Sequence, residues 1–213
     1  MGAVKTKRMP RAVREQQMLD AAVRIFGQRG YTAASMDDIA ELAGVSKPLV
    51  YLYLNSKDDL FTAVIRREAA VLIQAVRDAV DPARPVDQRL WDGLLAFFTH
   101  TSRNPDAWSV LHLQARTHGE RFAGEVAELR AEMVTFVTRL IAVAAREAHQ
   151  DPDLADHEVA GLGEALVGSA ESLATWANAT EGVTARQTAV TLMNFAWSGL
   201  GNLMSDQGWS ART

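Results

Sequence analysis

The chain has 213 residues, of which 48% are hydrophobic and 23% charged, a composition typical of a globular protein rather than a disordered one. It contains no cysteine, which excludes disulfides and thiolate metal sites, and no apolar run approaches the length of a membrane span. The net charge of −4 hides an asymmetry: residues 1–57 hold nine Lys or Arg against five Asp or Glu, whereas the rest holds thirteen against twenty-one. A basic end on an acidic body indicates a polyanionic partner, with a solvated tail as the alternative. We expect a cytoplasmic protein without a membrane partner.

Helical periodicity runs through nearly the whole sequence, and Pro, Gly, Asn and Asp residues divide it into segments. We therefore expect an all-α fold of about nine helices. The first four are predicted at residues 11–27, 35–43, 46–54 and 57–80, and the other five are predicted to end near residues 103, 119, 149, 179 and 205.

Two short helices joined by a tight turn follow the first long helix. Gly44 allows a positive φ at the turn, and Ser35 and Ser46 are predicted to cap the two short helices. This arrangement matches a helix-turn-helix, in which the second helix enters the major groove of DNA. An ordinary helical hairpin is the alternative.

The second short helix is predicted to have two faces. Val50 and Leu54 lie four residues apart and are expected to close a small core with Phe26, Ile39 and Leu42. The opposite face then presents side chains that can reach bases and phosphates, namely Lys47, Leu49, Tyr51 and Tyr53.

The stretch RIFGQRGYTAASMDDIAELAGVSKPLVYLYLNSKDDLF resembles the DNA-binding domain of TetR-family transcriptional regulators. The resemblance covers roughly residues 11–61, and the remainder matches the family only in its layout of helices. It implies DNA contacts by Ser35, Met36, Ser46, Lys47, Pro48, Leu49, Tyr51, Tyr53 and Lys57. Leu49 stands where the family commonly has Thr or Ser, which favours contact with a thymine methyl group over a hydrogen bond.

The resemblance also implies how the chain is divided. We expect a flexible basic arm at residues 1–10, a helix-turn-helix domain at 11–56, a ligand-binding and dimerisation domain at 57–206 and a tail at 207–213. The implied partners are a palindromic double-stranded DNA operator, a second copy of the chain and an unknown small-molecule effector. The implied function is that of a repressor released by its effector.

Small residues recur in the last two predicted helices, with large apolar residues between them. Two such helices from each of two chains would form a four-helix interface, although the glycines would equally serve packing within one chain. The predicted interface residues are Gly161, Leu166, Gly168, Leu173, Phe195, Gly199, Leu200 and Leu203.

Aromatic and polar residues of the middle helices are candidates for an effector pocket, although most aromatics in a helical protein belong to its core. The predicted lining residues are Trp91, Phe98, Trp108, His112, Arg116, Phe136 and Trp176. The five histidines are scattered, and no G-x-S-x-G elbow or P-loop is present. We expect no metal, no cofactor and no enzymatic activity. A helical carrier, or a helical enzyme with a non-functional helix-turn-helix, is the alternative.

Overall fold

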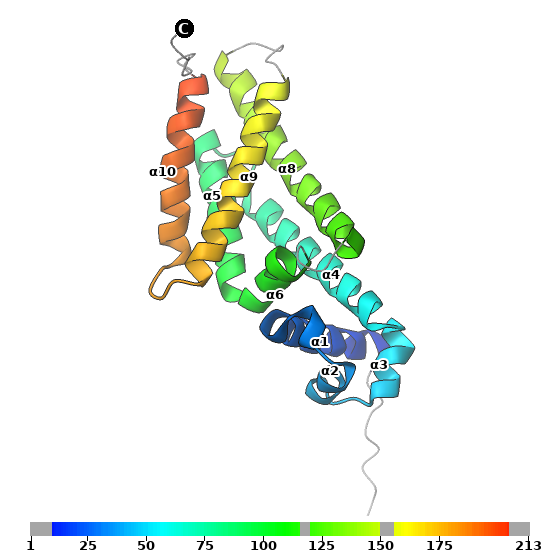
Figure 1. Cartoon of the computed structure of the whole chain (residues 1–213). Helices are drawn as coiled ribbons and strands as arrows, with labels where there is room; N and C mark the ends of the chain where they lie inside the picture. Colours follow the sequence, from blue (N-terminus) through cyan, green and yellow to red (C-terminus); the bar gives the residue numbers. More distant parts are fainter. Residues whose placement is uncertain (1–9, 116–119, 150–155, 205–213) are drawn as a thin grey trace, which may run out of the picture. The chain divides into compact units, whose positions relative to one another are not determined.

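The computed structural model describes residues 10–115, 120–149 and 156–204, and every regular element in these ranges is helical. Over these ranges the prediction of an all-α fold with about nine helices is confirmed, and Figure 1 shows how the helices are arranged within each unit. The elements are α1 (Arg11–Ala33), α2 (Met36–Leu42), α3 (Lys47–Leu54), α4 (Lys57–Ala79), α5 (Val86–Arg103), α6 (Pro105–Ser109), the π-helical segment η1 (Val110–Gln114), α8 (Glu120–His149), α9 (Asp156–Asn178) and α10 (Ala185–Met204).

The chain forms two compact units that do not follow the predicted boundary at residue 56. The first unit consists of Met1–Glu68 together with Asp106–Glu125, and the second consists of Ala69–Pro105 together with Val126–Thr213. The first unit thus contains α1 to α3, the beginning of α4, and a segment that is distant in sequence and includes most of α6, all of η1 and the start of α8.

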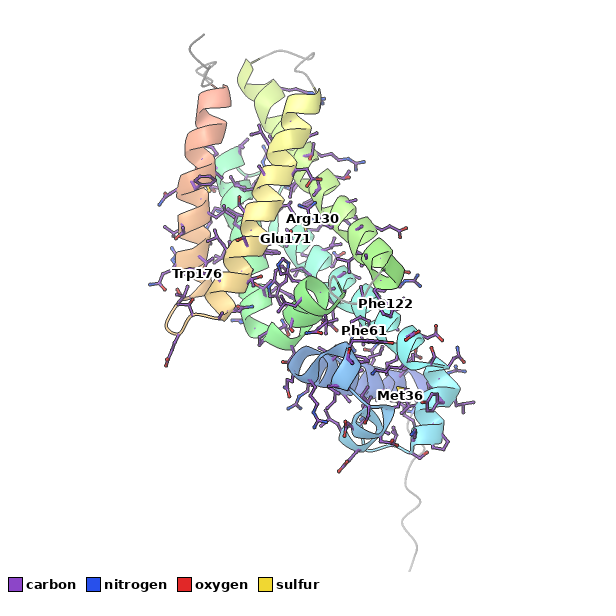
Figure 2. All side chains as sticks on the ribbon, viewed as in Figure 1. Met36, Phe61, Phe122, Arg130, Glu171 and Trp176 are labelled. Carbon is purple, nitrogen blue, oxygen red and sulfur yellow. The ribbon has the colours of Figure 1, made fainter. Side chains whose placement is uncertain are left out.

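An aromatic cluster explains why the start of α8 belongs to the first unit. Phe61 of α4 is fully buried, and its ring centroid lies 4.8 Å from that of Phe26 and 4.9 Å from that of Phe122 (Figure 2). Tyr31 packs against the same rings, at 4.9 Å from Phe61 and 5.3 Å from Phe122. Such ring pairs add to the stabilisation that comes from burial alone. The cluster therefore joins α1, α4 and α8.

The α6–η1 segment is held to the end of α1 by polar contacts. The Ser109 hydroxyl donates to the Gly27 carbonyl at 3.0 Å, and the Tyr31 backbone N–H donates to Gln114 Oε1 at 3.4 Å. Helix α1 is longer than predicted and is interrupted at Gly30, whose φ of +77° breaks the helical path. This break places the backbone of Tyr31 beside η1.

The turn between α2 and α3 forms largely as predicted. Gly44 has a φ of +66°, and the Ser35 hydroxyl accepts a hydrogen bond from the Asp38 backbone N–H at 3.0 Å. Ser46 occupies the cap position of α3, but its side chain makes no capping hydrogen bond, contrary to expectation. Leu42 is 44% exposed and does not join the predicted core, because it follows the inward-facing Ala40 by two residues and lies on the opposite side of α2.

In the second unit, α5, α9 and α10 pack side by side around a core that includes Leu94, Phe98 and Leu192 (Figure 1). Helices α8 and α9 also approach closely. A Cβ on Gly163 would lie only 2.1 Å from Thr138 Oγ1, so this glycine serves packing within the chain.

Candidate functional site

The outward face of α3 is the candidate DNA-reading surface. Val50 and Leu54 are the buried residues of this eight-residue helix, and its other side chains are exposed or half-buried. Lys47, Pro48 and Tyr51 are exposed, whereas Leu49 and Tyr53 are half-buried. A short helix with one buried stripe and polar or aromatic groups opposite it has a shape that the major groove of DNA admits.

The start of α3 offers two polar groups. The Ser46 residue is exposed, and its hydroxyl is not used for capping. Lys47 Nζ lies 2.8 Å from Asp37 Oδ2 in the first turn of α2. The hydrogen bond to Asp37 raises the pKa of Lys47.

The end of α3 carries a contact that sequence reasoning missed. The Arg11 guanidinium lies 5.0 Å from the centroid of the Tyr53 ring, so the first residue of α1 stands beside the last turn of α3. In the sequence, Arg11 is only one basic residue of several near the N-terminus. Because an arginine–tyrosine pair across two helices has no local sequence signature, only the structure identifies it.

Two residues predicted to contact DNA are buried or half-buried within the first unit. Met36 is 5% exposed, so its side chain belongs to the core of the first unit and is not available to a base or a phosphate (Figure 2). Lys57 is half-buried, with Nζ 4.6 Å from the centroid of the Tyr31 ring and 3.4 Å from the Thr32 carbonyl oxygen. Burial lowers the pKa of Lys57. The phosphate contact predicted for this lysine therefore competes with a contact inside the first unit.

The predicted effector residues do not form one site. Trp108 and His112 stack with ring centroids 4.9 Å apart, and both belong to the first unit. Phe98 is 2% exposed and belongs to the core of the second unit. The half-buried Trp91 lies under the Arg186 guanidinium, with 5.2 Å between the guanidinium and the ring centroid.

The other predicted effector residues are also dispersed. The Phe136 ring lies 5.6 Å from the Arg77 guanidinium, within the second unit. Trp176 is 52% exposed on the outer side of α9 and does not point into the core (Figure 2). Arg116 lies outside the described residues.

A groove between α4 and α5 in the second unit is a better candidate for the effector. It has a volume of about 580 Å³, a size typical of small-molecule sites. Small side chains leave it hollow, and the charged side chains of Arg84, Asp92 and Arg103 and the imidazole of His100 surround it. Its lining consists of Ala75, Ala79, Arg84, Asp92, Leu95, Ala96, Thr99, His100, Arg103 and Asn104. Alanines carry no functional signal in a sequence, so the groove was not predicted.

Helices α9 and α10 expose large apolar side chains. Phe195 is 72% exposed, and Trp176 and Val190 are also exposed. Of the predicted interface residues, Leu173 is half-buried, while Gly161 has no atom within 4 Å of a Cβ placed on it. Exposed large apolar side chains are candidates for an interaction surface where they form one contiguous patch.

The remaining predicted interface residues give less support to a dimer surface on α9 and α10. Leu166 is 8% exposed within the single chain, so it offers little area to a partner. Gly168 lies under Arg130, whose Nη2 atom is 3.8 Å from the position of a Cβ. The side chains at positions 199, 200 and 203 lie outside the described residues.

In the part of the chain that the structure describes, no helix is both long and apolar enough to cross a membrane. No group of three His, Asp or Glu side chains in that same part is arranged to hold a metal ion.

The fold and the exposed face of α3 place the chain in the class of helix-turn-helix proteins that also carry a larger helical unit. Comparison with known proteins gives the family. The family described as "Bacterial regulatory proteins, tetR family" matches residues 18–64, and the one described as "Tetracyclin repressor-like, C-terminal domain" matches residues 86–199. The chain belongs to the TetR family of bacterial regulatory proteins.

Several relatives extend along nearly the whole chain. The HTH-type transcriptional activator FasR of Mycolicibacterium smegmatis is 30% identical over 197 residues, which cover 92% of this chain and 87% of FasR. The crystal structure of a TetR-like transcriptional regulator from Rhodococcus sp. RHA1 is 36% identical, with a TM-score of 0.76 over 91% of this chain and 99% of that one. The chain is therefore a ligand-responsive, DNA-binding transcriptional regulator.

A more distant structure shares the fold. FadR from Bacillus subtilis, solved in complex with stearoyl-CoA, is 17% identical, with a TM-score of 0.76 over 86% of this chain and 98% of FadR. At this identity the likeness shows the fold alone.

Proposed function

We propose that the chain binds a palindromic operator in the cytoplasm as a homodimer, through the outward face of α3, and is released from DNA by a small-molecule effector. The exposed face of α3, with its charged Lys47 and the Tyr51 hydroxyl, is the observation that carries the proposal. A bound protein that covers a promoter excludes the polymerase, so binding represses transcription and release by the effector relieves that repression. The proposed role requires no catalysis.

The exposed apolar residues of α9 and α10 support a dimer. Covering Trp176, Val190 and Phe195 with a second copy would remove their apolar area from water. A twofold dimer presents two α3 helices, and helix-turn-helix dimers read half-sites about one helical turn of DNA apart. A palindromic operator is the DNA counterpart of this symmetry.

We propose further that the effector is an amphipathic anion of the fatty acyl thioester class, bound in the α4–α5 groove. Its alanine and leucine side chains suit an alkyl chain, and the Arg103 and His100 side chains suit an anionic group, whereas Arg84 pairs with Asp92 of the same lining. The bound stearoyl-CoA of FadR, a protein of the same fold, supports this class of ligand. Ala75 and Ala79 lie on the same continuous helix as Phe61 of the first unit, so a ligand that shifts α4 would act on both units.

Selection of bound fragments from a genomic DNA pool tests the DNA-binding proposal. Recovery of fragments that share a palindrome, with binding that weakens steeply with salt, is the expected result. A carrier or enzyme with a non-functional helix-turn-helix would recover no common sequence. Adding stearoyl-CoA, CoA alone or stearate to the complex then tests the effector class, and release by stearoyl-CoA but not by CoA is expected. A reporter gene under the recovered operator distinguishes repression from activation.

A further inference from the structure

The first turn of α2 contains two consecutive carboxylates with different surroundings. Asp38 Oδ2 lies 2.7 Å from Arg29 Nη1, and its backbone N–H is held by Ser35. The side-chain hydrogen bond from Ser35, together with Arg29, lowers the pKa of Asp38. This carboxylate therefore belongs to the junction of α1 and α2. Asp37 instead points its carboxylate to Lys47 at the start of α3.

The position of Asp37 is unfavourable for a protein that binds a polyanion. In a helix-turn-helix the start of the first helix of the motif approaches the DNA backbone, where free N–H groups and positive charge are favoured. The Asp37 side chain is 69% exposed in this region. Its pair with Lys47 is also exposed, and exposed ion pairs contribute little to folding stability. The ion pair therefore adds little to folding stability beyond the favourable placement of a carboxylate in the first turn of α2.

Asp37 has a geometric effect on the lysine. An ammonium group has three N–H donors on a flexible four-carbon stem, and an unrestrained lysine reaches phosphates as readily as bases. When one donor is directed to Asp37 Oδ2 at 2.8 Å, the directions of the other two are restricted. Two donors are what a guanine requires, because it presents O6 and N7 as acceptors in the major groove.

We propose that Asp37 is a specificity-determining residue that positions Lys47 for a guanine in the operator and disfavours binding to phosphates alone. This inference rests on the proposed function of α3 in reading DNA. On non-cognate DNA, Lys47 remains paired with Asp37 and neutralises no phosphate. On the operator, Lys47 keeps its bond to Asp37 and donates to the guanine, so the carboxylate is not left unpaired beside the DNA.

The variant Asp37→Ala tests this role, with Asp20→Ala as the matched control. Asp20 is 68% exposed and pairs with Arg67 at 2.7 Å, so the control removes the same charge from another exposed carboxylate, while Arg67 keeps its contacts with Glu68 and Gln16. Asp37→Ala frees Lys47 for one additional phosphate contact, which steepens the salt slope of non-specific binding by about 0.9. Between 200 and 50 mM salt, non-specific affinity should then rise about 3.5-fold more than for the wild type. Asp20→Ala should match the wild type.

Base preference is the readout that a merely structural role would not change. Against operators with single-base substitutions, Asp37→Ala should lose about tenfold in discrimination at one guanine of each half-site. In a Lys47→Ala background, Asp37→Ala should change no base preference, because the lysine it positions is absent. If Asp37→Ala raises affinity for all DNA equally in both backgrounds, the carboxylate only repels phosphate and the positioning role is overturned.

The result for the wild-type chain distinguishes a failure of the proposed DNA-reading function from a failure of the proposed role of Asp37. A wild-type chain without sequence preference overturns the proposed DNA-reading function, and the role of Asp37 with it. If the wild type prefers its operator and the Asp37→Ala variant shows the same base preference and the same salt slope, only the role of Asp37 is overturned. Circular dichroism and melting temperature of both variants establish that each is folded.

Discussion

Gly27 of α1 lies directly against the backbone of Asp106 at the start of α6. A Cβ placed on Gly27 would lie 2.6 Å from the Asp106 carbonyl oxygen and 2.7 Å from its Cα. Backbone atoms cannot turn away as the tip of a side chain can, so α1 and the α6–η1 segment fit together only because residue 27 has no side chain.

Gly27→Ala is therefore expected to destabilise the first unit. Overpacking of this kind costs about 1–3 kcal/mol, and the better helix propensity of alanine recovers only part of it. Gly124→Ala is the matched control, because a Cβ on Gly124 in α8 meets no atom within 4 Å. The control should gain about 0.5–1 kcal/mol from helix propensity. Urea unfolding of both variants measures the difference, and equal stabilisation would show that α1 and α6 are not in tight contact.

Lys57 distinguishes a phosphate contact from an internal one. Because its ammonium lies over the Tyr31 ring, Lys57→Met should lower stability by about 0.5–1 kcal/mol, the usual worth of a cation–π contact. The salt slope of DNA binding should stay unchanged. A slope reduced by about 0.9 would show that Lys57 turns outward and neutralises a phosphate in the complex.

Lys47 and Tyr51 are expected to have different roles on α3. Lys47→Ala should cost about 1–3 kcal/mol on the operator and relax the preference at one base pair in each half-site. Tyr51→Phe removes one hydroxyl and should cost about 0.5–1.5 kcal/mol on every sequence alike. Binding of both variants to a panel of single-base operator changes tests the assignment. A change of base preference by Tyr51→Phe alone would mean that α3 enters the groove in another orientation.

Phe195 tests the proposed dimer surface. Because its side chain is 72% exposed in the single chain, Phe195→Ser should leave the fold intact and weaken the dimer. Leu52→Ser is a matched control, since Leu52 on α3 is 73% exposed and lies in the other unit. Light scattering over a dilution series should show earlier dissociation for Phe195→Ser only. Equal dimer stability in both variants would place the interface elsewhere.

Local features of the first unit could be predicted because their causes are local. The φ of Gly44 and the cap at Ser35 follow from the residue types and their spacing. Val50 and Leu54 share one helix face, and both are buried. The family resemblance added the DNA-binding role that spacing alone left open.

Features that depend on tertiary contacts could not be predicted in the same way. The sequence around Trp176 would look the same whether its side chain lay on an outer face, as it does, or in a pocket. The α4–α5 groove is formed where alanines leave space, which a search for functional residue types does not detect.

The first unit is built from two stretches of chain separated by residues 69–105, which belong to the second unit. A fragment ending at residue 68 would lack Phe122 and would leave Tyr31 and Phe61 without one of their ring partners. Grafting this DNA-reading unit onto the effector unit of another regulator therefore requires transfer of residues 106–125 as well. Specificity for DNA and response to the effector cannot be recombined in this protein by exchange at a single junction.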